Sequence, residues 1–123
     1  SSFDISKNKI SSLPESIWYL KNLFSLDITG NNISSLPEEI CNLKNLEMLY
    51  ADFCNISSIP ENIGEMENLE ELIIRNNKIT SIPDSINDLN NLKMLYISDN
   101  PLNNSSEELL YNLEDKGVEV EYF

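Results

Sequence analysis

The sequence predicts an α/β solenoid, a superhelix in which one short β-α unit is stacked repeatedly along the chain. The first observation is a pattern that recurs every 23 residues over most of the 123-residue chain. The second is that prolines, asparagines and leucines all fall on this offset, at Pro14, Pro37, Pro60 and Pro83; at Asn22, Asn45, Asn68 and Asn91; and at Leu23, Leu46, Leu69 and Leu92. Such a period is typical of repeats that bury their apolar sides only against their neighbours.

Each repeat is expected to contain a strand and a short helical return. The alternation around Leu26, Asp27 and Ile28 predicts a strand of a few residues with its apolar side chains directed inward. Residues 33–43 then return the chain through a loop and a short helix. Pro37 suits the first turn of that helix, where the missing N–H of proline has no cost.

The second repeat carries the resemblance to a family. Its pattern is L23-x-x-L26-x-I28-x-x-N31-x-I33-x-x-L36-P37-x-x-I40-x-x-L43-x-N45-L46. This pattern resembles a leucine-rich repeat of the LPxxIxxLxxL type, found in Ras-group-related and many bacterial proteins. The resemblance implies a right-handed solenoid with a parallel sheet on its concave side, and it implies binding of other proteins.

One polar position also follows the repeat, and it is expected to be structural. It holds Asn8, Asn31, Asn77 and Asn100, with Cys54 in the third repeat. Where a strand gives way to a loop, an amide can both donate to and accept from backbone groups that have no ladder partner. We therefore expect a buried asparagine ladder, in which a small thiol replaces one amide. Cys41 is expected to be half-buried on the convex side.

The two ends of the chain are predicted to differ. Residues 1–102 form about five repeats, the first of them truncated, and residues 103–123 form a C-terminal cap. In that cap Ser105 or Ser106 starts a helix that stops at Gly117, and a final strand follows. The first repeat has no such cap, so residues preceding Ser1 or self-association would cover its apolar face. Trp18 and Tyr19 are expected to be exposed there, as a contact site or against an upstream cap.

Composition excludes several classes of function. The formal net charge of −13 makes nucleic acid an unexpected partner, and no apolar run is long enough for membrane insertion. The chain has no histidine, no phosphate-binding loop and no nucleophile beside a base, so we expect no enzyme and no cofactor. Asp4 and Asp27 share one column, but two carboxylates predict solvated side chains rather than a metal site.

Localisation depends on the cysteines. Cys41 and Cys54 do not form the terminal clusters of extracellular repeat proteins, which favours a cytoplasmic protein. The alternative is a secreted or cell-surface protein, because glycosylation motifs occur at Asn32, Asn55, Asn103 and Asn104. A signal peptide before Ser1 would support that alternative.

The candidate partner-binding residues come from the outward strand positions. Equivalent positions of parallel strands lie in register, so adding 23 gives columns of side chains on the concave face. From the third repeat onward these columns carry large apolar residues and a charged rim: Met48, Tyr50, Asp52, Phe53, Glu71, Ile73, Arg75, Met94, Tyr96 and Ser98. Exposed aromatic and methionine side chains beside charged ones are typical of protein-binding surfaces. The alternative interpretation is that these residues only stabilise the sheet through cross-strand pairs.

The sequence therefore predicts a protein-protein interaction module that binds a protein or peptide through its concave face. One alternative is a regulatory or targeting segment of a larger signalling enzyme. Another is a surface or secreted adhesin or recognition protein.

Overall fold

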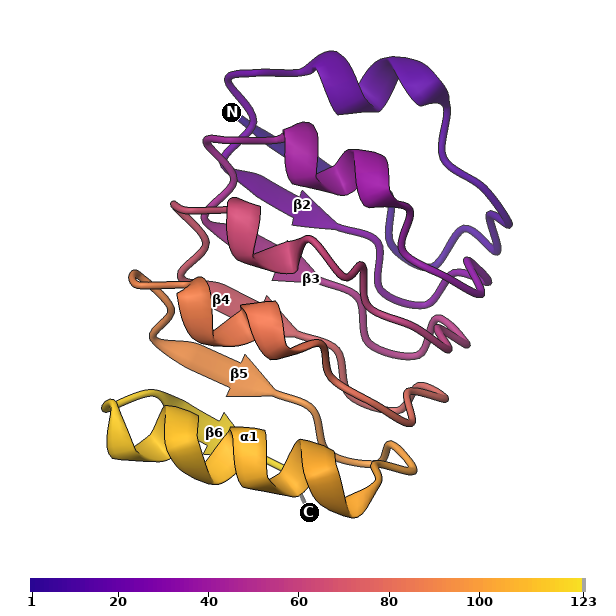
Figure 1. Cartoon of the computed structure of the whole chain (residues 1–123). Coiled ribbons are helices and arrows are strands. Elements are labelled where there is room, and N and C mark those ends of the chain that lie inside the picture. Colours follow the sequence, from indigo (N-terminus) through magenta and orange to yellow (C-terminus); the bar gives the residue numbers. More distant parts are fainter. Residues whose placement is uncertain (123) are drawn as a thin grey trace.

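The computed structural model describes residues 1–122, and in this part of the chain the strands form one six-stranded parallel sheet. The order of the strands in the sheet follows the order in the sequence. Figure 1 shows them stacked one above another. They are β1 (Ser2–Asp4), β2 (Ser25–Asp27), β3 (Met48–Tyr50), β4 (Glu71–Ile73), β5 (Met94–Tyr96) and β6 (Glu119–Glu121).

The helical segments form a second layer. Those in the described part of the chain are four 3-10 helices, η1 (Glu15–Tyr19), η2 (Glu38–Asn42), η3 (Ile63–Glu65) and η4 (Asp84–Asp88), and the α-helix α1 (Asn104–Asp115). Figure 1 shows these segments on one side of the sheet. The sheet therefore has a covered face, and an opposite face, called here the open face, which corresponds to the predicted concave face.

The position of the repeated proline differs slightly from the prediction. Pro37 lies just before η2 in an extended conformation, with φ −74° and ψ 154°, rather than in the first turn. Its carbonyl oxygen accepts from the N–H of Ile40 at 3.1 Å and so closes the turn. Proline fits this position because its fixed φ directs the chain into the helix and its missing N–H is not needed.

The core lies between the two layers. Leu26, Leu49, Leu72 and Leu95 are the central residues of four successive strands, and none of them is exposed to solvent. They are paired in register, so each leucine packs in one column with the next. The alternation of strand side chains thus sends the central leucine into the core and its two neighbours to the open face.

The asparagine ladder is confirmed at Asn31. Its side-chain oxygen accepts from the N–H groups of Asn8 and Ile10, at 3.1 and 2.9 Å. Its amide nitrogen donates to the carbonyl oxygens of Ile5 and Ile28, at 2.9 and 2.8 Å. One buried side chain therefore satisfies four backbone groups from two adjacent repeats.

Cys54 occupies the equivalent position and makes fewer side-chain hydrogen bonds to the backbone. Its thiol donates to the carbonyl oxygen of Ile28 at 3.0 Å, and its own carbonyl oxygen accepts from the N–H of Ile33 at 3.0 Å. The backbone has thus taken over the acceptor role of the missing amide. Both cysteines are buried, and Cys41 is 1% exposed, so the expectation that it is half-buried was wrong.

A set of equivalent residues, one after each of β1 to β5, turns the chain into the following loop. It contains Lys7, Gly30, Phe53, Asn76 and Asp99, and all five have φ between 55° and 75°. Glycine and asparagine accept this left-handed conformation readily, whereas a bulky aromatic residue does not. Lys7 and Phe53 are therefore the strained members of this set, and Phe53 is the aromatic one.

The predicted C-terminal helix and strand are present as α1 and β6, and the helix begins at a different residue. The N-cap of α1 is Asn103, whose side chain accepts from the N–H of Ser106, and not Ser105 or Ser106. Ser106 is instead buried, and its hydroxyl accepts from the N–H of Ile82 at 2.9 Å. The helix stops before Gly117, which has φ 98°, and β6 then pairs with β5.

The N-terminal repeat contains a correction and an exposed apolar surface. Trp18 is 6% exposed and belongs to the core, whereas its neighbour Tyr19 is 74% exposed. The predicted exposed pair is therefore a single exposed tyrosine. Phe3, Leu20 and Phe24 in the same part of the chain are also exposed.

None of the helices in residues 1–122 is long and apolar enough to cross a bilayer.

Candidate functional site

The open face carries two full columns of outward side chains. The first column is Ser2, Ser25, Met48, Glu71, Met94 and Glu119, and the second is Asp4, Asp27, Tyr50, Ile73, Tyr96 and Glu121. Cα partners in adjacent strands confirm the predicted register for β1 to β5. Small and acidic residues therefore occupy β1 and β2, and large residues occupy β3 to β5.

A hollow of about 370 Å³ lies at the centre of this face. Its lining comes from four successive repeats and contains Asp27, Thr29, Tyr50, Asp52, Glu71, Ile73, Arg75, Met94 and Tyr96. Seven of these nine residues belong to the predicted site, so the structure brings most of that site into one depression.

Ile73 forms the floor of the hollow rather than an exposed anchor. It is 6% exposed, although the sequence predicted an outward residue accessible to a partner. Its register neighbours in the column are Tyr50 and Tyr96, whose rings flank it on both sides. Two large side chains thus cover the smaller one between them, while both tyrosines remain half-exposed.

Carboxylates hold the hydroxyl groups of both tyrosines. The Tyr50 hydroxyl donates to Glu71 Oε1 at 3.0 Å, and the Tyr96 hydroxyl donates to Glu119 Oε2. Burial and the bond to Glu71 raise the pKa of Tyr50 to about 12. The bond to Glu119 raises the pKa of Tyr96 as well. The rings are therefore fixed in orientation, with their hydroxyl groups protonated at neutral pH.

Arg75 is paired with two carboxylates of the protein. Its guanidinium pairs with Asp52 at 2.8 Å and with Glu121 at 3.6 Å. It also lies over the ring of Tyr96, 5.7 Å from the centroid. The hydrogen bond to Asp52 is the main reason why the pKa of Arg75 is raised. The Arg75 side chain is nevertheless 37% exposed, so contact with a partner stays a prediction.

Asp52 and Ser98 are buried beside Arg75 and Glu121, so neither is a surface residue. The Ser98 hydroxyl donates to Glu121 Oε1 at 2.9 Å. These two residues of the predicted site position charged groups, and they offer little surface to a partner.

The remaining apolar members differ in accessibility. Met48 and Met94 are half-buried on β3 and β5, whereas Phe53 is 62% exposed. Phe53 combines this exposure with the left-handed φ of 55° described above. A bulky residue in that conformation costs about 1–2 kcal/mol, and burial of its side chain does not offset the cost.

Three carboxylates that line the hollow or bind the side chains around it were not among the predicted site residues. Asp27 lines the hollow, and Glu119 and Glu121 bind Tyr96, Arg75 and Ser98. The pairing of β5 with β6 explains why two of them were missed. It pairs Tyr96 with Glu121, which is 25 residues later. Adding 23 to Tyr96 therefore gives the wrong partner, and only the alternation of residues 118–122 could have indicated the right one.

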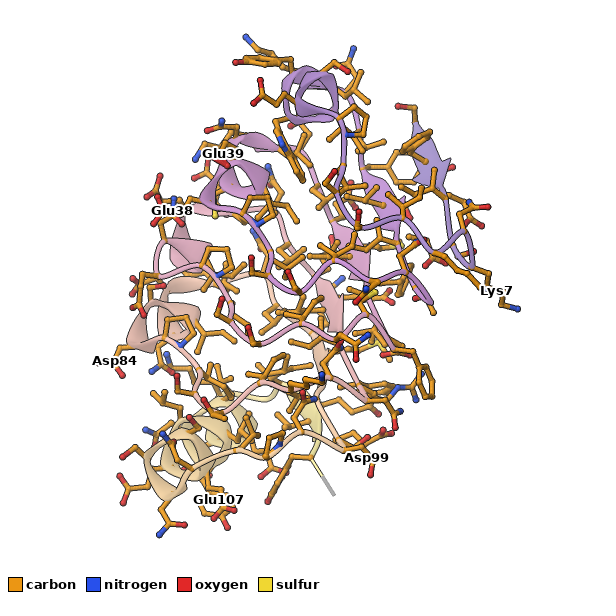
Figure 2. The ribbon with its side chains drawn as sticks, turned by 90° about the vertical axis from the view of Figure 1, so that its right-hand side faces the viewer. Lys7, Glu38, Glu39, Asp84, Asp99 and Glu107 are labelled. Carbon is orange, nitrogen blue, oxygen red and sulfur yellow. The ribbon has the colours of Figure 1, made fainter. Side chains whose placement is uncertain are left out.

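A second hollow, of about 450 Å³, lies on the covered side of the molecule beside Gly64. It is lined by Glu38, Glu61, Asn62, Gly64, Glu65, Ser85 and Asp88. Figure 2 shows that Glu38, Glu39 and Asp84 lie on the helical side and point outward. Solvated acidic side chains without an aromatic or aliphatic floor do not form a comparable site.

Metal and thiol chemistry find no support in the described residues. In residues 1–122 no group of three or more histidine, cysteine, aspartate or glutamate side chains is arranged to hold a metal ion. Asp4 and Asp27 instead accept from the N–H groups of Ser6 and Thr29. Burial raises the pKa of Cys41 to about 11 and also raises that of Cys54, so both thiols are protonated at neutral pH.

A parallel sheet with sequential strand order, a helical layer and an asparagine ladder define a repeat solenoid. The family model "Leucine-rich repeat region" matches residues 3–112. The chain belongs to the leucine-rich repeat family. This family is commonly used for protein interaction and is typically non-enzymatic.

Solved structures give the same fold. A leucine-rich repeat protein of Leptospira interrogans is 32% identical with a TM-score of 0.91, over 98% of this chain and 30% of that chain. An internalin F of Listeria monocytogenes is 24% identical with a TM-score of 0.81, over 98% of this chain and 33% of that one.

An internalin C2 of Listeria monocytogenes is 22% identical with a TM-score of 0.76, over 98% of this chain and 50% of that one. The chain thus spans between about a third and a half of these relatives. No curated protein matches it significantly.

Proposed function

We propose that this chain is a protein-binding module, and that it binds a peptide segment of its partner on the open face around the 370 Å³ hollow. The single observation that carries the proposal is the half-exposed pair Tyr50 and Tyr96, which flank Ile73 on a face that bears no helix in residues 1–122. Large apolar side chains on such a face are typical of contact surfaces.

Pre-organisation supports the same proposal. The rings of Tyr50 and Tyr96 are held by hydrogen bonds to Glu71 and Glu119, so little side-chain entropy is lost when a partner covers them. Both rings offer a large apolar area with few rotatable bonds, which is why tyrosine is frequent in binding surfaces.

Phe53 adds an observation that sheet stability alone does not explain. Cross-strand pairing could account for Tyr50, Ile73 and Tyr96, because they are neighbours in one column. Phe53 lies beyond β3, is 62% exposed and adopts an unfavourable backbone conformation. Because Phe53 destabilises the fold and exposes an aromatic ring, a role of this residue in binding is favoured.

The test is a selection of random displayed peptides on the wild-type chain. Recovered peptides are then measured against a Tyr50→Ser/Tyr96→Ser variant and against Phe53→Asn, which is expected to fold at least as stably as the wild type. We expect binding to fall at least tenfold for the double variant, as anchor residues typically contribute more than 1.4 kcal/mol.

The matched control is Tyr19→Ser/Tyr111→Ser, which removes two exposed tyrosines that lie in η1 and α1, away from the open face. Peptides should bind this control as they bind the wild type. Thermal unfolding of every variant shows whether the fold is retained. If peptides bind all the folded variants equally, the open face is not the binding site.

A second candidate function is self-association through the N-terminal repeat. Phe3 in β1 is exposed, as are Leu20 and Phe24 of the first repeat, and β1 forms an edge of the described sheet. Within residues 1–122 no strand pairs with this edge, and an unpaired strand edge beside apolar residues favours pairing with another chain. Light scattering over a range of concentrations should then show dimers that a Leu20→Ser/Phe24→Ser variant does not form. A wild-type chain that stays monomeric throughout would contradict this candidate.

A further inference from the structure

We infer that the hollow on the open face accepts a cationic side chain, so that the preferred partner presents lysine or arginine in an extended basic segment. This inference rests on the proposed function and specifies the chemistry of the ligand. It follows from three features of the site: an intramolecular cation already bound to one tyrosine, an equivalent tyrosine without a cation, and the charge of the face.

The first feature is the surroundings of Tyr96. The guanidinium of Arg75 lies 5.7 Å from the ring centroid, and carboxylates hold it on two sides, Asp52 at 2.8 Å and Glu121 at 3.6 Å. An aromatic face together with carboxylates binds a guanidinium through cation–π attraction and charge-assisted hydrogen bonds. The protein therefore fills one such arrangement with its own side chain.

The second feature is the surroundings of Tyr50. Tyr50 occupies the same column as Tyr96, two strands earlier, and its hydroxyl is bonded to Glu71. Asp27 is its register partner on the other side. The position that Arg75 occupies relative to Tyr96 corresponds here to Thr29, a small neutral residue that lines the hollow. Within residues 1–122 the ring of Tyr50 has carboxylates on both sides and no basic side chain over it.

The third feature is the balance of charge on the open face. Its outward positions in residues 1–122 carry six carboxylates and one cation: Asp4, Asp27, Asp52, Glu71, Glu119 and Glu121 against Arg75. Asp52 and Glu121 are paired with Arg75, which leaves the Tyr50 side of the hollow negative. The whole chain, at −13, adds to this field and accelerates the approach of a basic ligand.

The shape of the site completes the inference. The floor at Ile73 is apolar, the wall at Tyr50 is aromatic, and the rim at Asp27 and Glu71 is anionic. A lysine or arginine side chain has the matching arrangement, an aliphatic stem that ends in a positive charge. A neutral apolar side chain would leave the carboxylate rim partly desolvated and without a partner, which disfavours it.

The first experiment is the sequence composition of peptides selected on the wild-type chain. We expect lysine and arginine to be enriched, and aspartate and glutamate to be depleted, among peptides that lose binding to Tyr50→Ser/Tyr96→Ser. Peptides that depend on this face but lack basic residues would overturn the inference and leave the proposed function intact. A selection without any face-dependent peptide would overturn both.

The second experiment uses Glu71→Gln and Asp27→Asn with one selected basic peptide. The amide of Glu71→Gln still accepts from the Tyr50 hydroxyl, so the ring keeps its support while one charge is lost. We expect each variant to bind about tenfold more weakly at low salt, with the difference reduced at high salt. The matched control is Glu38→Gln/Glu39→Gln on the helical side, which removes two exposed charges.

The outcomes separate a local contact from the effect of net charge. If the control variant loses as much affinity as Asp27→Asn and Glu71→Gln, the ligand senses only the overall charge and the proposed side-chain site is wrong. If Asp27→Asn and Glu71→Gln keep wild-type affinity, the cationic side chain does not enter this hollow. Equal binding of a poly-anion such as single-stranded DNA would also contradict the inference.

Discussion

Asp52 accepts three hydrogen bonds from a single residue of the next repeat, Arg75. Its Oδ1 accepts from the backbone N–H of Arg75 at 2.6 Å, and its Oδ2 accepts from Nη2 at 2.8 Å and from Nε at 3.2 Å. The same carboxylate thus extends the backbone ladder beyond β3 and β4 and fixes the guanidinium over Tyr96. A residue that the sequence assigned to the binding rim therefore supports the fold of the open face.

The Asp52–Arg75 contact predicts different outcomes for two substitutions. Asp52→Ala leaves the Arg75 N–H without its acceptor, and we expect it to reduce the free energy of unfolding by about 1–3 kcal/mol. Asp52→Asn retains an acceptor oxygen and should lose less. Urea unfolding of both variants measures the difference. Equal losses would mean that the charge of Asp52, and not the backbone bond, is the important term.

The ladder predicts that equivalent positions do not contribute equally to stability. Asn77 accepts from the N–H groups of Cys54 and Ile56 and donates to the carbonyl oxygens of Ala51 and Ile74. Asn77→Ala should therefore cost at least about 3 kcal/mol, because several buried backbone groups lose partners.

Cys54→Ala is the matched comparison. The thiol makes only weak hydrogen bonds, and the Cys54 carbonyl that accepts from Ile33 remains in the variant. We expect a loss of about 1 kcal/mol in the same urea experiment. If Cys54→Ala were as unstable as Asn77→Ala, the Cys54 carbonyl oxygen would not be replacing the asparagine side-chain oxygen as the acceptor.

Phe53 is predicted to be replaceable with a gain in stability. Phe53→Asn places a residue that tolerates the left-handed conformation at φ 55°, where the next repeat already has Asn76. We expect the free energy of unfolding to rise by about 0.5–1 kcal/mol while affinity for selected peptides falls. Calorimetric unfolding measures the first change. A variant that is less stable than the wild type would show that the ring contributes to packing.

Trp18 and Tyr19 provide a direct contrast between neighbours. Trp18 is buried in the core, so Trp18→Ala should cost about 3–5 kcal/mol. Tyr19 is 74% exposed, and Tyr19→Ala should change stability by no more than about 0.5 kcal/mol. Comparable effects of the two substitutions in thermal unfolding would contradict the assignment of Trp18 to the core.

The fold could be predicted from the sequence because each repeat buries the same kind of side chains and satisfies the same backbone groups. The leucines at the centre of β2 to β5 and the ladder asparagines recur every 23 residues, so an error in the prediction of one position is corrected by the others. Cys54 fits the same rule once its carbonyl is counted as an acceptor. Side chains that occur only once lack this redundancy, and Trp18 was predicted to be exposed because no other repeat has an aromatic residue at its position.

The sequence could predict which residues of the candidate site share a column. It could not predict which of their side chains are exposed and unpaired. Accessibility at Ile73 depends on the size of Tyr50 and Tyr96 beside it, and the availability of Arg75 depends on Asp52 and Glu121. These are contacts between repeats, which single-repeat patterns do not contain. Glu121 in particular comes from the cap, where the register changes from 23 to 25 residues.

The most direct test of the account is to map a selected peptide on the isotope-labelled chain by the amide chemical shifts of its NMR spectrum. Binding on the open face predicts that the shifts change in residues 48–53, 71–75 and 94–98, around the hollow, and that Tyr50→Ser/Tyr96→Ser abolishes the changes. Shift changes confined to the helical side, in residues 38–42 and 61–65, would contradict the central claim that this module binds its partner through the open face of the sheet.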